Sequence, residues 1–152
     1  WAHWEEWFVE VEEAHTTYPA LNFFRSPVPT RSWIAASSAV LDAAAILHST
    51  VALRPDPQAA LVIRSGYMAL RRIADFFGIE HDPDPASDDP ISVHRREWEA
   101  LYDELEAVGV PLVADREQAW RDYAGWRVNY DRVLVAIAAL IDSPLPGLRP
   151  ET

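Results

Sequence analysis

The residues best suited to chemistry lie near the N-terminus, where Glu12 and His15 form a Glu-x-x-His pair. This spacing places a carboxylate and an imidazole on one helical face, as in the di-iron sites of ferritin-like bundles. Such a site needs the pair twice, together with two further glutamates. No other histidine of this chain follows a glutamate by three residues, so the sequence argues against a di-iron centre.

A single-metal site formed by Glu12, His15, Asp42 and His48 is a second hypothesis. At about 100° per residue, Asp42 and His48 point about 240° apart around their helix, so one ion could not readily bind both. The chain has no cysteine, which excludes thiolate ligands and a disulfide framework. We therefore expect no metal and no other cofactor.

An electrostatic role explains the same residues more simply. Asp42 falls within an apolar, alanine-rich segment, and a buried carboxylate must be paired or hydrogen-bonded. We expect its partner to be Arg25 or His15, with Glu12 and Tyr18 in the same polar network. The stretch 12–26 is then the end of a helix and a turn forced by Pro19, because proline disfavours a helical conformation in the preceding residue.

Two arginines suggest an alternative ligand site. Arg64 and Arg71 are seven residues apart and thus lie on nearly the same helical face, where guanidinium groups could receive an anionic ligand. Established catalytic patterns are missing: the sequence has no Gly-x-Ser-x-Gly elbow, no glycine-rich phosphate loop and no His-Glu-x-x-His motif. We therefore expect a protein that is not an enzyme.

The elements that position these residues are helices. Apolar residues recur at three- and four-residue spacing, as in Trp1, Trp4, Trp7 and Val11. The pattern predicts an all-α, single-domain bundle of about five helices over residues 1–142, with a long last helix. The expected helices cover residues 1–17, 32–52, 57–77, 92–108 and 114–142. Residues 79–91, rich in proline and aspartate, have the composition of a disordered linker, and residues 143–152 are expected to form a flexible tail.

Composition limits the partners. The formal net charge of -11 opposes binding to nucleic acid or anionic lipid, because both require basic patches. All 13 basic residues are arginine, and with the abundant alanine this indicates a GC-rich bacterial genome. The apolar runs are shorter than the roughly 20 residues that span a bilayer, so we expect no direct membrane insertion. The chain begins with Trp1 and not methionine, which suggests part of a longer polypeptide.

A resemblance to a known family suggests where in the cell this chain acts. The residues that carry it are Glu13-Ala14-His15, Tyr18-Pro19, Phe24-Arg25-Ser26, Trp33 and Leu41-Asp42-Ala43-Ala44. This pattern resembles the soluble region that follows the pore in bacterial two-helix, potassium-channel-type membrane proteins. The likeness covers roughly the first half of the chain and fades beyond Phe77. It implies a cytoplasmic domain tethered to the inner membrane, but the chain has no selectivity-filter sequence, so ion conduction is not assigned to it.

Together these observations predict a non-catalytic regulatory or assembly domain of such an ion-channel-like protein. Its tryptophan-bearing first helix would contact the upstream transmembrane segment of the same protein, another partner or a second copy of the chain. The alternative is a small-ligand or metal-binding helical module, with or without an enzymatic role, in which the polar residues converge on a pocket between the first three helices.

Overall fold

The computed structural model describes residues 1–18 and 32–142, and within these ranges it confirms the all-α class. Arg25 and residues 143–152 therefore lie outside the described residues. No helix in the described ranges combines the length and apolar character that crossing a bilayer requires. The helices of this part of the chain are α1 (Ala2–Thr17), α2 (Trp33–Ser49), α3 (Pro57–Phe76), α4 (Arg95–Ala107), α5 (Arg116–Arg127) and α6 (Asp131–Asp142).

Local sequence signals explain where several helices begin and end. The Asp56 carboxylate accepts a hydrogen bond of 2.9 Å from the backbone N–H of Gln58, and Pro57 occupies the first turn of α3. Ser32 caps α2 in the same way through the N–H of Ala35, at 3.2 Å. Gly78 and Gly109 follow α3 and α4 with φ of 66° and 81°, a left-handed conformation that favours glycine.

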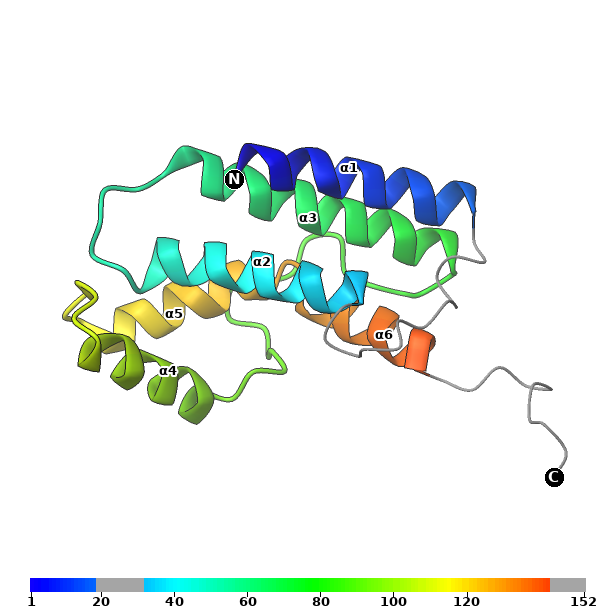
Figure 1. The fold of residues 1–152 in the computed structure, drawn as a ribbon. Coiled ribbons are helices and arrows are strands. Elements are labelled where there is room, and N and C mark those ends of the chain that lie inside the picture. The colour runs from blue at the N-terminus through cyan, green and yellow to red at the C-terminus, as the bar shows by residue number, and fades with distance from the viewer. Residues whose placement is uncertain (19–31, 143–152) are drawn as a thin grey trace, which may run out of the picture.

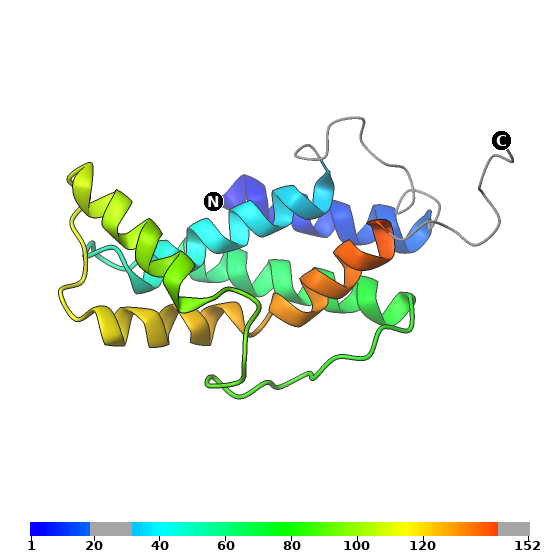
Figure 2. The same cartoon turned by 90° about the horizontal axis from the view of Figure 1, so that it is seen from below.

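The helices are arranged around α2. Figure 1 shows α1 and α3 side by side in one layer, α2 beneath them, and α5 and α6 on the other side of α2. In the view from below in Figure 2, α4 lies on the face away from α1. The fully buried side chains come from every layer and include Phe8, Leu41, Ile63, Leu70 and Ile137.

The expected long last helix is wrong: the segment forms two helices separated by a turn at residues 128–130. Asn129 accounts for the break, because its side-chain N–H₂ donates to the carbonyls of Gly125 and Trp126 at 3.1 and 3.2 Å. A side chain that bonds helix carbonyls in this way competes with the helical backbone. Arg71 of α3 holds the turn from outside by donating to the Asn129 carbonyl at 3.0 Å.

Residues 79–91 form no helix or strand, but hydrogen bonds tie them to the helices. Arg71 donates to the carbonyl of Pro83 at 2.8 Å, and the His81 ring lies 2.8 Å from the Asp75 carboxylate. Arg71 therefore joins the linker to the α5–α6 turn, since the same guanidinium also binds Asn129.

Candidate functional site

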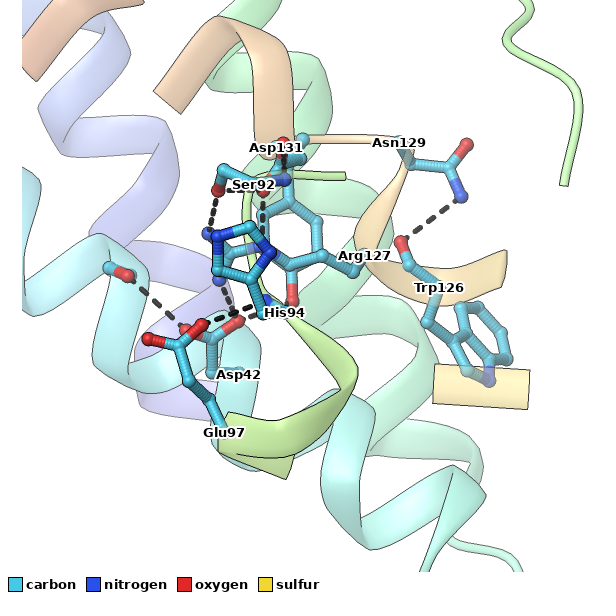
Figure 3. Close-up of polar contacts among 10 residues, drawn as sticks. Asp42, Ser92, His94, Glu97, Trp126, Arg127, Asn129 and Asp131 are labelled. Atoms are coloured by element: carbon cyan, nitrogen blue, oxygen red, sulfur yellow. Dashed lines mark hydrogen bonds and ion pairs between the residues drawn. The ribbon is translucent and has the colours of Figure 1, made fainter. Parts of the chain in front are cut away.

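A buried guanidinium occupies the junction of three helices. Arg127, the last residue of α5, has a side chain that is 6% exposed. Its Nη1 donates to Asp42 Oδ1 of α2, and its Nε donates to Asp131 Oδ1 of α6 at 2.7 Å (Figure 3). The α5–α6 turn separates the two, so that Arg127 before the turn reaches both Asp42 of α2 and Asp131 after the turn. We call Arg127, Asp42, Asp131, Ser92 and Tyr130 the polar centre.

Asp131 attaches the end of the linker to this centre. Its Oδ2 accepts the backbone N–H of Ser92 at 2.7 Å, and its Oδ1 accepts the Ser92 hydroxyl at 2.6 Å. These bonds add to the one from Arg127, so the buried carboxylate of Asp131 has three donors. Since charged hydrogen bonds are stronger than neutral ones, this arrangement fixes the path of the chain that leads into α4.

Asp42 is paired, as the sequence predicted, but with Arg127, a residue 85 positions away that the sequence analysis did not consider. Tyr130 also donates its hydroxyl to Asp42 at 2.9 Å, and Ser38 donates at 3.3 Å. The Asp42 side chain is 27% exposed, so the carboxylate lies at the edge of the core and not in its interior. The predicted partner Arg25 lies outside the described residues.

The ionisable groups at the polar centre are suited to hydrogen bonds and ion pairs, and not to proton transfer. Burial opposes the charged form of Arg127, but the carboxylates of Asp42 and Asp131 outweigh it and raise the pKa of the guanidinium. Burial, reinforced by the negative charge of Asp42, raises the pKa of the Tyr130 and Tyr123 hydroxyls. None of these three groups therefore gives up a proton near neutral pH.

The prediction that Glu12, His15 and Tyr18 surround Asp42 is wrong for the two of them that have other partners in the structure, Glu12 and His15. Glu12 binds Nη1 of Arg72 on α3 through both carboxylate oxygens, at 2.9 and 3.1 Å. His15 stacks on Trp33 at a centroid distance of 4.2 Å, and burial lowers its pKa. Tyr18 is exposed at the end of α1. Although the two residues share one face of α1, Glu12 therefore binds α3, whereas His15 packs on the first residue of α2.

The surroundings of Arg64 and Arg71 lend no support to the predicted anion site. Arg64 is exposed, while Arg71 lies with its guanidinium carbon 4.5 Å from the centre of the Tyr67 ring. The donors of Arg71 that bind Pro83 and Asn129 are already used for carbonyl groups of the protein. The two guanidinium groups thus have different surroundings.

The hypothesis of a single-metal site that includes Asp42 and His48 finds no support in the part of the chain that the structure describes. No group of three or more histidine, aspartate and glutamate side chains there is placed to hold a metal ion. His48 instead hydrogen-bonds through Nε2 to the carbonyl of Asp56, at 3.0 Å, and its ring packs on Trp126.

One sequence signal could have pointed to the polar centre. Arg127 and Asp131 are four residues apart within a seam of apolar and aromatic residues that runs from Trp120 to Ile141. Opposite charges at this spacing usually stabilise an exposed helical face. Here they lie on the apolar face, where an ion pair must have further partners. Such a pair therefore predicts a buried centre, even though it does not identify Asp42.

Comparison of the chain with known proteins does not assign it to a family. Neither the family models, nor the curated proteins, nor the solved structures that were compared with the chain give a match.

Replacing Asp42 with asparagine tests the ion pair between Asp42 and Arg127, the more exposed of the two ion pairs in the polar centre. The amide keeps the shape and one acceptor oxygen but removes the charge that Arg127 binds. We expect the free energy of unfolding to fall by about 1–2 kcal/mol, because charged hydrogen bonds contribute about 1.5–3 kcal/mol and this carboxylate is partly exposed. Urea denaturation measures the change. The matched variant Asp103→Asn, on exposed α4, should shift stability by less than about 0.5 kcal/mol.

Proposed function

We propose that this chain is a non-catalytic regulatory or assembly domain that binds a partner through α1. The polar centre supports a structural role for its ionisable residues, because each of its charged groups is paired with another group of the protein. The pKa shifts support the same role, since the tyrosines and the arginine at the centre are held in their protonated forms. Several described helices expose apolar side chains, and α1 is the one among them that exposes a tryptophan at its surface.

The observation that carries this proposal is an aromatic side chain anchored at the surface of an acidic helix. Trp4 is 39% exposed and packs edge-on against Trp7, which in turn packs against the buried ring of Phe8. Val9 is also exposed on this helix. A rigid, partly exposed tryptophan supported by the core is a typical anchor of a protein interface.

The charge of α1 selects the kind of partner. The helix contains Glu5, Glu6, Glu10, Glu12 and Glu13 but no arginine or lysine. A second copy of the chain packed on α1 through the same face would oppose like charges, which is costly. We therefore infer that the partner is an amphipathic segment with basic and apolar residues.

The resemblance to channel-type proteins suggests where such a segment would come from. Cytoplasmic residues next to transmembrane helices carry an excess of lysine and arginine. In that setting, the basic flank of the pore-forming helices would bind α1, and the domain would regulate or assemble the membrane protein from its cytoplasmic side. The tethered location and the regulatory role are both part of this proposal.

A synthetic amphipathic helix of leucine and lysine tests the proposal. We expect it to bind the protein with a micromolar Kd, and Trp4→Ser to weaken binding about tenfold, which corresponds to about 1.4 kcal/mol. Fluorescence anisotropy of the labelled peptide measures the Kd, and circular dichroism checks that the variant remains folded.

Two controls separate this interface from general attraction to an acidic protein. Val108→Ser removes an exposed apolar side chain that directly follows α4, a helix on the face away from α1 (Figure 2), and should leave the Kd unchanged. A peptide with glutamate in place of lysine should not bind. If Trp4→Ser and Val108→Ser have equal effects, or if neither peptide binds, α1 is not the docking face.

A further inference from the structure

The layer of α1 and α3 has an outer side that no other described helix covers (Figure 1). On the inner side, Phe8 of α1 and Leu41 of α2 adjoin Gly66 of α3. Arg72 of α3 is exposed, so the bond that it donates to Glu12 of α1 crosses the outer side of the groove between the two helices. This ion pair identifies the side chains that share the outer side.

Three exposed apolar side chains lie on the same side as the ion pair. Leu61 and Met68 precede Arg72 by eleven and four residues, spacings that place all three on one face of α3. Val9 precedes Glu12 by three residues and is its neighbour on the surface of α1. Val9 is 60% exposed, Leu61 46% and Met68 37%. We call Val9, Glu12, Leu61, Met68 and Arg72 the outer face.

The positions of the apolar side chains along the two helices match. Helices α1 and α3 run in the same direction (Figure 1). The Phe8 ring lies against Gly66, near the middle of α3. Its neighbour Val9 is therefore level with the gap between Leu61 and Met68.

A two-fold axis parallel to the helices makes the outer face complementary to itself. Half a turn about such an axis places α1 of one copy over α3 of the other and leaves every group at its height along the helices. Val9 then enters the gap between Leu61 and Met68 of the other copy. Glu12 of each copy meets Arg72 of the other, so the four groups form a square in which adjacent charges are opposite.

Charge disfavours the other face-to-face arrangement of two copies. A two-fold axis perpendicular to the helices would place α1 on α1. Each of these helices carries five glutamates and no arginine or lysine, and like charges that face each other are costly. The arrangement of α1 over α3 avoids this repulsion.

The size of the face indicates how strongly two copies bind. Helices of 16 and 20 residues are roughly 24 and 30 Å long, and each is about 10 Å wide. The outer face thus measures on the order of 500 Å² in each copy. Two copies together reach the roughly 1,000 Å² at which specific interfaces begin, so the dimer is weak and reversible.

We propose that the outer face binds a second copy of this chain, with α1 of each copy over α3 of the other. Val9 lies five residues after Trp4 and hence about 140° from it around α1. The surface at Trp4 and the outer face are therefore separate, and the dimer does not rest on the proposed binding of a basic segment.

Sedimentation equilibrium tests the dimer. The average mass should rise with protein concentration from 17.2 kDa, the mass of one chain, toward twice that value near about 1 mM. Glu12→Arg would bring four arginines together in the dimer, and Arg72→Glu would bring four glutamates together. Each variant alone should weaken dimerisation at least about tenfold, and circular dichroism checks that it is folded.

A mixture of the two variants is the decisive sample. The arginines of the Glu12→Arg chain would face the glutamates of the Arg72→Glu chain, so the square again has opposite charges across the interface. We expect the mixture to regain the dimer that each variant alone has lost. A charge reversal that merely damaged its own chain could not be compensated by a different chain.

The apolar contact has a control of matched exposure. Leu61 and Val135 are both 46% exposed, but Val135 lies on α6, on the other side of α2 (Figure 1). Leu61→Ser should weaken the dimer, whereas Val135→Ser should leave it unchanged.

Three results would overturn the proposal: a constant mass of 17.2 kDa up to about 1 mM, a folded mixture that stays monomeric, or equal effects of the two serine variants. The mass is measured without peptide, so none of these results affects the binding proposed at Trp4.

Discussion

Replacing Arg127 with alanine is expected to lower the free energy of unfolding by about 3–5 kcal/mol, the cost of removing one partner from a buried ion pair. The guanidinium is the shared donor of Asp42 and Asp131, so its loss leaves two carboxylates without their counter-charge. Asp131 is the more costly of the two because it is buried. The variant should also loosen Ser92, whose two bonds to Asp131 depend on the position of that carboxylate.

Urea denaturation of Arg127→Ala and of Arg121→Ala provides a matched comparison on the same helix. Arg121 is exposed and binds Gln118 and Glu117 of its own helix, so its replacement should change stability by less than about 0.5 kcal/mol. Similar small losses in the two variants would mean that the polar centre contributes little to stability.

The boundaries of the helices were largely predictable because local chemistry sets them. Helix α3 begins at Pro57, as the expected range 57–77 has it, since the Asp56 cap and a proline in the first turn act within two residues. Gly78 and Gly109 end α3 and α4 for the same kind of reason. Signals of this type need no knowledge of the tertiary structure.

The break between α5 and α6 was not predictable from the apolar pattern. Hydrophobic residues continue across residues 128–130 at nearly helical spacing, so the seam resembles that of one long helix. The break depends on the Asn129 side chain and on Arg71, which comes from a different helix. Periodicity records which face is buried, and it does not record a competing hydrogen bond at one residue.

The partner of Asp42 was missed for the same reason. The sequence shows that a carboxylate within an apolar helix needs a counter-charge, and the structure supplies one. Which arginine supplies it depends on the bend that directs Arg127 inward, and the bend was not predicted. Nearness in sequence favoured Arg25 and His15, whereas the fold brings together α2 and the end of α5.

The turn at residues 128–130 therefore has several consequences for the molecule. It places Arg127 against Asp42 and Asp131 against Ser92. One turn therefore connects α2, α6 and the end of the linker through the same guanidinium and carboxylate.

Gly66 gives the second large effect, because it lies on α3 against side chains of both α1 and α2. A Cβ atom added at this position of α3 would lie 2.4 Å from Leu41 Cδ2 and 3.0 Å from the Phe8 ring. Both neighbours are fully buried and have little room to move. We expect Gly66→Val to lower the free energy of unfolding by about 3 kcal/mol, at the upper end of the cost of overpacking.

Gly125 of α5 is the matched control, since an added Cβ there would meet Ser87 at an ordinary 3.7 Å. Gly125→Ala should stabilise the protein by up to about 1 kcal/mol through helix propensity, whereas Gly66→Ala should destabilise it despite the same gain. Opposite signs in thermal or urea denaturation would locate the close contact at Gly66. Equal stabilisation by both alanines would show that α1 and α2 can move away from α3, and hence that α1 is held less firmly than its role as a docking helix requires.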